Sequence, residues 1–325
     1  MIAATYSATG GSDVLSVGEV STPAPGPGEV LVRLEVAGVN PTDWKSRAGN
    51  TGDVAFAFQV PGQDGAGVVE AVGEGVAKTW VGERVWVYFA AWKRQWGTAA
   101  EYTVVPVAQA VPLPSDASFE LGASLGIPAL TAYHCLFADG PLDGRRVLVA
   151  GGAGAVGHAA IELARWGGAE VVTTVSSDEK AELAQAADLV VNYREAGAAE
   201  RIGKVDRIVE VALGPNLELD LAVANPHTVI STYAADVTTA EVPIRQLMTP
   251  NLVLRFVLVY TIPEAALHAA VDGVAKAVGA GALTTLPLHR FALADTAAAH
   301  DAVEAGAVGK VVIDVAPDSD RLPAP

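Results

Sequence analysis

The chain is poor in cysteine and in basic residues, and each shortage excludes a class of protein. Of its 325 residues only one, Cys135, is a cysteine, so no internal disulfide can form. Lysine and arginine number 21 against 37 acidic residues, which gives a net charge of -16, and no basic run is long enough to follow a phosphate backbone. We therefore expect neither nucleic acid nor an anionic membrane surface as a partner.

Long hydrophobic runs and a secretion signal are also absent. Residues 1–6 lack a basic segment followed by an apolar core, and the most apolar stretches are interrupted by proline, glycine or charge. Hydrophobic residues nevertheless make up 51% of the chain, which at this length is enough for about two globular cores. These features predict a cytoplasmic globular protein.

The chain also lacks the residues that build a catalytic zinc site. Such a site needs cysteine, histidine and acidic ligands that converge on one ion with an open position. The single thiol, Cys135, lies in an apolar helical pattern, where a small buried residue is a simpler interpretation than a nucleophile. The histidines show no ligand spacing and are His134, His158, His227, His268, His289 and His300. We therefore expect chemistry without a metal.

The most specific pattern present is a strand that runs into glycines and then into a helix. An apolar run ends at Ala150 and continues as Gly151-Gly152-Ala153-Gly154-Ala155-Val156-Gly157. Glycines let the backbone approach phosphates closely, and the following helix offers unpaired N–H groups and the positive end of its dipole. A second apolar strand at 170–175 completes a βαβ unit, which predicts a dinucleotide site; a glycine-rich turn in an ordinary α/β sheet is the alternative.

Two kinds of organisation follow each other along the chain. Residues 1–120 carry the pattern of a small all-β barrel, with strands expected at 30–36, 67–72, 84–89 and 101–105. Residues 121–285 become an alternation of strands and helices from Arg145 onward, as in a parallel doubly wound sheet, with strands at 189–192, 207–211, 228–232 and 252–258. Residues 286–325 return to the first domain. Helices are expected at 264–278 and 294–304, a strand at 310–315 and a disordered end at 316–325.

The end of the second strand of the βαβ unit indicates which nucleotide binds. An NAD enzyme usually places a carboxylate there, whereas this chain has Ser176-Ser177, with Lys180 one turn into the next helix. Hydroxyls and an ammonium suit a 2′-phosphate, which favours NADPH. Two observations point the other way: Ser176 with Glu179 also fits a helix capping box, and Asp178 and Glu179 would repel a phosphate unless they point away.

With these features assembled, the chain resembles the medium-chain dehydrogenase/reductase superfamily, in the zinc-free quinone oxidoreductase branch that includes zeta-crystallin. The resemblance covers nearly the whole chain and rests on residues 37–43, 61–69, 97–102, 127–133, the glycine loop and residues 308–312. Where zinc-dependent relatives have His-Glu after Pro-Gly, this chain has Gln63-Asp64, which agrees with the missing metal ligands.

The resemblance implies an α/β fold in which a GroES-like β-barrel domain is joined to a Rossmann doubly wound parallel sheet, with NADPH in the cleft between them. It places Gly154, Ala155 and Val156 at the pyrophosphate, Ser176 and Lys180 at the 2′-phosphate, and Tyr193 at the adenosine end. Around the nicotinamide it places Asn40, Thr131, Leu258 with Val259 and Tyr260, and Lys310.

The reaction so implied is hydride transfer without a metal, in which hydrogen bonds must stabilise the oxyanion. Candidate donors are Lys45, Asn40 and Tyr260. Relatives carry a tyrosine at the position of Lys45, so this ammonium is either the donor or a solvated side chain at the cleft mouth. The expected function is NADPH-dependent reduction of a quinone. Enoyl or enone reduction, and a weakly catalytic, crystallin-like role in binding NADPH, are the alternatives.

Two further segments complete the expectations. Aromatic residues are only 6% of the chain but gather at 86–96, where they either stack on a flat acceptor or pack the barrel, and the loop 92–96 could overhang the cleft. The apolar strand at 251–258 is similar to edge strands through which such proteins pair, so we expect a homodimer.

Overall fold

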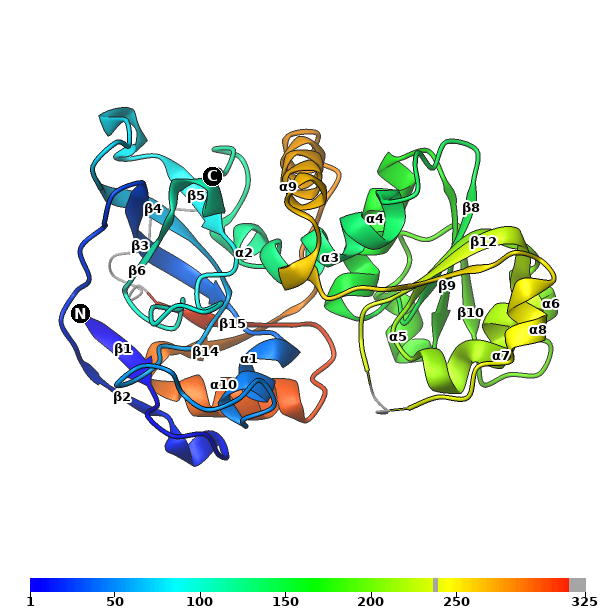
Figure 1. Ribbon diagram of the computed structural model, residues 1–325, viewed down its shortest axis with the longest axis horizontal. Helices are drawn as coiled ribbons and strands as arrows, with labels where there is room; N and C mark the ends of the chain where they lie inside the picture. The colour runs from blue at the N-terminus through cyan, green and yellow to red at the C-terminus, as the bar shows by residue number, and fades with distance from the viewer. Residues whose placement is uncertain (236–238, 316–325) are drawn as a thin grey trace. The chain divides into compact units, whose positions relative to one another are not determined.

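The computed structural model describes residues 1–235 and 239–315, which fold as two compact units (Figure 1). Unit 1 contains residues 1–127 and the chain from Pro287 onward, and unit 2 contains residues 128–286. The first boundary lies later than the expected residue 120, because helix α2 (Phe119–Gly122) still packs on the strands of unit 1. The disorder expected at 316–325 concerns residues outside the described part of the chain.

Unit 1 is built on a seven-stranded sheet of order β14-β15-β3-β4-β5-β7, with β6 also paired to β3. Its pairs are antiparallel except β14 with β15. The strands are β3 (Glu29–Gly38), β4 (Asp64–Val72), β5 (Arg84–Val87), β6 (Tyr102–Pro106), β7 (Ala110–Pro112), β14 (Leu288–Ala292) and β15 (Lys310–Asp314). Alternate residues of the central strand β3, such as Val30, Val32 and Leu34, enter the apolar core. A separate pair, β1 (Ile2–Thr5) and β2 (Ser16–Glu19), was not expected from the sequence.

Unit 1 is not all-β, which corrects the expectation for residues 1–120. Helix α1 (Pro41–Arg47) follows β3 directly, with Pro41 at its first turn and Asp43 accepting a hydrogen bond from the backbone N–H of Asn40 at 2.7 Å. Helix α10 (Thr296–Glu304), from the far end of the chain, packs beside α1 (Figure 1). The buried Arg47 binds Glu304 across these helices at 2.9 Å.

Unit 2 is a six-stranded, all-parallel sheet of order β10-β9-β8-β11-β12-β13 (Figure 1). Its strands are β8 (Arg146–Ala150), β9 (Glu170–Val175), β10 (Leu189–Asn192), β11 (Val205–Glu210), β12 (Ala224–Thr232) and β13 (Val253–Phe256). The chain order, third-second-first and then fourth-fifth-sixth, reverses next to β8. In such sheets the reversal opens the crevice that binds a dinucleotide.

Helices lie before, between and after the strands of unit 2. They are α3 (Gly126–Phe137), which brings the chain into the unit, α4 (Ala155–Trp166), α5 (Asp178–Glu182), α6 (Ala198–Ile202), α7 (Leu213–Val223), α8 (Ile244–Met248) and α9 (Glu264–Gly279). Helix α4 packs on β8 and β9, and α7 packs on β11 and β12. Among the described residues, no helix is both long enough and apolar enough to cross a membrane.

Candidate functional site

The glycine loop between β8 and α4 has the close approaches that a phosphate cradle requires. A Cβ on Gly157 would lie 2.3 Å from the carbonyl oxygen of Gly151, so the loop and the first turn of α4 touch. Gly151 has a φ of 71°, and Gly154 is exposed at the N-cap of α4. Ala155 and Val156 begin the helix, whose first N–H groups have no partner within it. These residues fit the pyrophosphate of a dinucleotide.

The carboxyl ends of β9 and β10 gather the residues expected at the adenosine end. The N–H of Tyr193 donates to the carbonyl of Val175 at 3.1 Å, so Tyr193 lies beside the residue that precedes Ser176. Tyr193 is 42% exposed, and the Arg194 guanidinium lies 5.9 Å from the centre of its ring. The edge therefore holds a hydroxyl, a phenol and a cation that the sequence did not single out.

Ser177, and not Ser176, caps helix α5. The Ser177 Oγ accepts from the N–H of Lys180 at 3.4 Å, so the alternative interpretation, a capping box of Ser176 with Glu179, is wrong. The helix begins one residue later than that capping box requires. Among the described residues no hydrogen bond engages the Ser176 hydroxyl, which leaves it able to bind a ligand.

A second polar group is buried in unit 1, where β3, β4 and β15 meet. Asp64, which begins β4, pairs with Gly38 of β3, and Gly38 pairs with Val312 of β15. Asn40 Nδ2 donates to Asp64 Oδ2 at 2.7 Å, and Lys310 Nζ donates to Asn40 Oδ1 at 2.8 Å. These three residues, which we call the amide centre, are no more than 3% exposed.

Glycines make room for the amide centre. A Cβ on Gly126 would lie 2.1 Å from Asp64 Oδ1, and a Cβ on Gly38 would lie 3.2 Å from Lys310 Nζ. The first allows the N–H of Ile127, at the start of α3, to reach Asp64 Oδ1 at 2.9 Å and Oδ2 at 3.0 Å. Both oxygens of Asp64 are thus used.

Burial changes the acidity of this group. It raises the pKa of Asp64 to about 6, although Lys310 and the N–H donors oppose the shift. It raises the pKa of Asp43 to about 7, helped by the charge of Asp64, and lowers the pKa of Lys310 against the opposing effect of both acids. The Lys310 ammonium and the ionised Asp64 carboxylate are both buried, and each stabilises the charge of the other.

The remaining predicted residues are divided between the units. Lys45 is on α1 in unit 1, partly exposed, with its Nζ 5.7 Å from the centre of the Trp44 ring. Thr131 is buried on α3, Leu258 is 55% exposed, and Tyr260 lies in a turn of 3₁₀ helix at Val259–Thr261; all three belong to unit 2. Of the residues predicted around the nicotinamide and the acceptor, the structure thus shows Asn40 and Lys310 in contact with each other. Lys45 belongs to the same unit as these two, and Thr131, Leu258 and Tyr260 belong to the other.

The aromatic segment of unit 1 is largely packed. Trp86, Tyr88 and Phe89 are no more than 3% exposed. The loop that follows is tied to the barrel, because Arg94 donates to Glu29 at 2.8 Å and to the Val104 carbonyl at 2.9 Å. Gln59 Nε2 also donates to the carbonyls of Arg94 and Gln95 in this loop, each at 2.8 Å.

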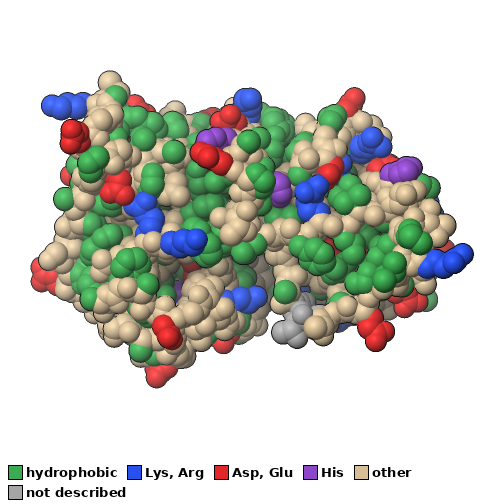
Figure 2. Space-filling view, viewed as in Figure 1, with side chains coloured by type: hydrophobic (Ala, Val, Ile, Leu, Met, Phe, Trp, Pro, Cys, Tyr) green, Lys and Arg blue, Asp and Glu red, His purple; other side chains and the backbone are tan. Residues whose placement is uncertain are grey.

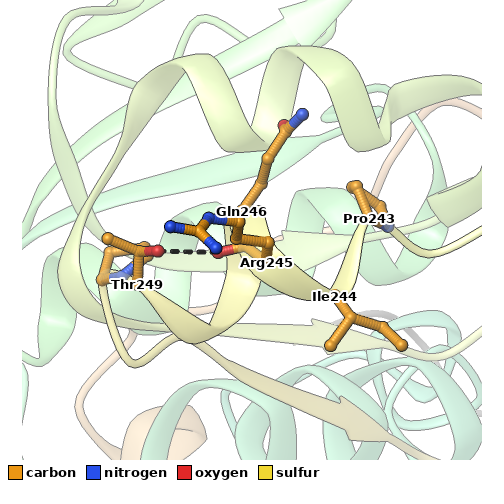
Figure 3. Close-up of a pocket in the computed structure, with 6 residues that line it drawn as sticks. Pro243, Ile244, Arg245, Gln246 and Thr249 are labelled. Carbon is orange, nitrogen blue, oxygen red and sulfur yellow. Dashed lines mark hydrogen bonds between the residues drawn. The ribbon is translucent and has the colours of Figure 1, made fainter.

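No group of three or more histidine, cysteine or acidic side chains is placed to hold a metal within the part of the chain that the structure describes. Cys135 is fully buried, and burial raises the pKa of its thiol to about 12. A hollow on unit 2 is lined by α8 and its neighbours, where Thr249 Oγ1 donates to the Arg245 carbonyl at 2.8 Å (Figure 3). The hollow contains none of the predicted site residues.

Comparison with known proteins matches both units. Residues 26–115 match the alcohol dehydrogenase GroES-like domain, and residues 155–285 match the zinc-binding dehydrogenase family. A mycobacterial quinone oxidoreductase is 30% identical with a TM-score of 0.82, covering 96% of this chain and 99% of that one. The chain belongs to the medium-chain dehydrogenase/reductase superfamily, in its quinone oxidoreductase branch.

Other members of the superfamily differ in what their names state. The quinone oxidoreductase of Rattus norvegicus is 35% identical over 222 residues, 65% of this chain and 66% of that protein, so the chain spans about two thirds of it. An NAD-dependent alcohol dehydrogenase is 27% identical with a TM-score of 0.87, covering 97% of this chain and 100% of that one. The superfamily and the fold are thereby shown, and this chain is an oxidoreductase.

Sequence reasoning did not single out Asp43, Asp64 or Arg194 as site residues. Asp64 contacts Asn40 across 24 positions of sequence, and Lys310 does so across 270. A local sequence pattern cannot predict contacts between residues so far apart in the chain. Arg194 comes directly after Tyr193, which was predicted at the adenosine end of the cofactor. Its position next to Tyr193 is a sequence signal that could have identified it as a second cation for the 2′-phosphate.

Proposed function

We propose that this chain catalyses the NADPH-dependent reduction of a quinone without zinc. The observation that carries the proposal is the amide centre of unit 1. There, the Asn40 amide bonds to Asp64 and to the Lys310 ammonium, and Gln63-Asp64 stands where zinc-dependent relatives have His-Glu; both oxygens of Asp64 are engaged by N–H groups. Such a site has hydrogen-bond donors for an oxyanion and no thiolate.

The choice of NADPH is supported by the edge formed by β9 and β10. No acidic residue ends β9, and the Ser176 hydroxyl is not used by the helix cap. Lys180 follows in helix α5, and Arg194 comes directly after Tyr193, whose backbone bonds to Val175 at the end of β9. A mycobacterial protein solved in complex with NADPH is 30% identical to this chain with a TM-score of 0.82. Charge-assisted hydrogen bonds favour a 2′-phosphate over a bare ribose hydroxyl.

The protein's share of the reaction is binding, orientation and charge stabilisation. NADPH, when bound, supplies a hydride. The loop Gly151–Gly157 would hold its pyrophosphate, and Ser176, Lys180 and Tyr193 its adenosine end. A donor aimed at the acceptor oxygen would stabilise the negative charge that develops there, an effect worth about 3–4 kcal/mol. Lys45, Asn40 and Tyr260 are the candidates.

We also propose a small-molecule substrate and a homodimer. On the face shown in Figure 2, lysine and arginine side chains lie singly among acidic and polar ones, an arrangement unlike a nucleic-acid surface. Strand β13 is at an edge of its sheet, with Phe256 73% and Val253 43% exposed. Pairing of this edge with a second copy would satisfy its backbone and cover these side chains. Location in the cytoplasm stays a prediction from the sequence.

The proposal is tested by initial rates of cofactor oxidation. NADPH and NADH are each compared with a flat ortho-quinone and with a simple cyclic enone as acceptors. Fast consumption of NADPH with the quinone is the expected result. Preference for the enone would make the protein an ene-reductase. Tight binding of NADPH without turnover of either acceptor would contradict quinone reduction and favour the weakly catalytic binding role.

A further inference from the structure

The Asn40 side chain lies between a group that can only accept and a group that can only donate. An ionised carboxylate has no proton to give, and an ammonium has no lone pair. Nδ2 therefore faces Asp64 at 2.7 Å, and Oδ1 faces Lys310 at 2.8 Å. Turning the amide over would set two donors against each other at Lys310 and two acceptors against each other at Asp64. The amide has one orientation.

The partners of Asn40 are themselves held. Asp64 accepts from the N–H of Ile127 with both oxygens, and Lys310 also donates to the Val39 carbonyl at 3.3 Å. The backbone N–H of Asn40 donates to Asp43 Oδ2 at 2.7 Å. Position and direction of the amide are thus fixed by contacts from β4, β15 and α1 before any ligand arrives.

One proton of the amide has no acceptor among the residues that the structure describes. Nδ2 carries two protons, and Asp64 takes one of them. Asn40 is 2% exposed, so bulk water does not readily serve the other. A buried donor in a fixed direction is the arrangement that stabilises a developing negative charge without reorganising at the moment of reaction.

We propose that Asp64 and Lys310 are positioning residues that lock the Asn40 amide, and that the second N–H of Asn40 Nδ2 donates to the oxyanion of the acceptor. The inference rests on the proposed function. In the step concerned, a hydride carries its electron pair to the acceptor, whose carbonyl oxygen becomes negative. Asn40 stabilises that oxygen with a hydrogen bond and loses no proton, and water supplies the proton that completes the product.

Lys45 is a weaker choice for this role. Its side chain is partly exposed, and its ammonium is directed over Trp44 at 5.7 Å. A flexible chain of that length must be ordered in each reaction, whereas the Asn40 amide is already fixed.

The test exchanges the two side chains. In Asn40→Asp/Asp64→Asn the amide at position 64 donates to the carboxylate at position 40, whose second oxygen accepts from Lys310. The total charge and the contact between positions 40 and 64 are kept, and the remaining oxygen at position 64 still accepts from the Ile127 N–H, but the spare N–H at position 40 is lost. We expect the melting temperature to stay near that of the wild type and kcat with the quinone, at saturating NADPH, to fall by about 10²–10³-fold.

The single variant Asp64→Asn and the surface variant Asp116→Asn are the controls. In Asp64→Asn the new amide can still accept from Asn40, but the negative charge beside the buried Lys310 is lost, which should lower the melting temperature; the exchange restores that charge. Asp116 is exposed, and its change should alter neither quantity. An exchange variant no more stable than Asp64→Asn would overturn the lock.

The kinetic measurements test whether Asn40 donates to the acceptor oxyanion. An exchange variant with the kcat of the wild type would overturn the role of Asn40 and transfer it to Lys45 or Tyr260. If the wild type oxidises NADPH with neither acceptor, the proposed function fails and the donor role with it, while the melting temperatures still report on the lock.

Discussion

Ser176 is the residue on which the choice between NADPH and NADH most directly depends. It follows β9, and its hydroxyl is not part of the α5 cap. In Ser176→Asp a carboxylate would repel the 2′-phosphate and accept from the free ribose hydroxyls of NADH. We expect the KM for NADPH to rise about tenfold or more and the KM for NADH to change little. Equal changes in both constants, measured by initial rates, would remove Ser176 from the site.

Glu210 and Asp220 form a buried carboxyl pair that the proposed chemistry does not use. They are 0% and 1% exposed, and Glu210 Oε2 and both oxygens of Asp220 have no donor among the described residues. Burial raises the pKa of Asp220 to about 9, and the neighbouring charge of Glu210 adds to the shift. A proton shared between the two acids supplies the missing hydrogen-bond donor and removes the repulsion between two buried negative charges.

This pair makes stability depend on pH. Because the folded pKa of Asp220 is raised from 3.8 to about 9, the folded state holds an extra proton between these values. Its contribution is fully present below about pH 4 and is lost as pH rises toward 9, by at most about 1.4 kcal/mol per pH unit. We expect Asp220→Asn, whose amide can donate to Glu210, to melt several degrees above the wild type at pH 9 and with a flatter pH profile. Parallel melting curves would contradict the shared proton.

At the same scale, the sequence predicted some site residues and not their connections. The family motifs placed Asn40 and Lys310 around the nicotinamide, and the structure shows that their side chains contact each other. They did not show that Asn40 also bonds to Asp64, because that contact depends on the register of β3 with β4. The pairing of Glu210 with Asp220 was also missed, since it depends on how α7 packs on β11.

Among the elements, the loop before α4 offers a test of where the pyrophosphate lies. A Cβ on Gly157 would lie 2.3 Å from the Gly151 carbonyl, so Gly157→Ala should lower both the melting temperature and the affinity for NADPH. A Cβ on Gly154 meets only the Gly151 carbonyl, at 3.4 Å. Gly154→Ala should therefore fold normally and bind NADPH about tenfold more weakly, since the methyl group takes the space of a phosphate. Unchanged affinity in a fluorescence titration of Gly154→Ala would place the phosphates elsewhere.

The elements that the sequence predicted best are two neighbouring strands of the parallel sheet. Strands β9 and β10 begin and end as expected, because runs of β-branched and apolar residues favour strands; β9 is almost wholly buried, and β10 is the partly buried edge. The misses are short: α1, α6 and the pair β1–β2 depend on partners elsewhere in the chain. Helix α1 carried a readable signal in Asn40-Pro41, which starts a helix as readily as it ends a strand.

At the scale of the whole molecule, unit 2 presents an apolar surface around its open sheet edge. Strand β13 pairs with β12 on one side only. Phe256 and Leu258 are 73% and 55% exposed, and α8, which leads into β13, exposes Ile244 by 74% and Met248 by 66%. An exposed apolar edge of this kind is usually covered, because an uncovered one recruits other chains.

A homodimer through β13 makes a prediction that a single charge can test. Light scattering at micromolar concentration should give twice the 33.3 kDa of one chain. Phe256→Lys would place two like charges close to the two-fold axis and leave the edge unpaired, so we expect the monomer mass and a lower melting temperature. Val81→Lys is the matched control, because Val81 is a half-exposed apolar residue of unit 1, and it should stay dimeric. A wild-type protein with the mass of one chain would refute pairing, and a dimer that survives Phe256→Lys would move the interface away from β13.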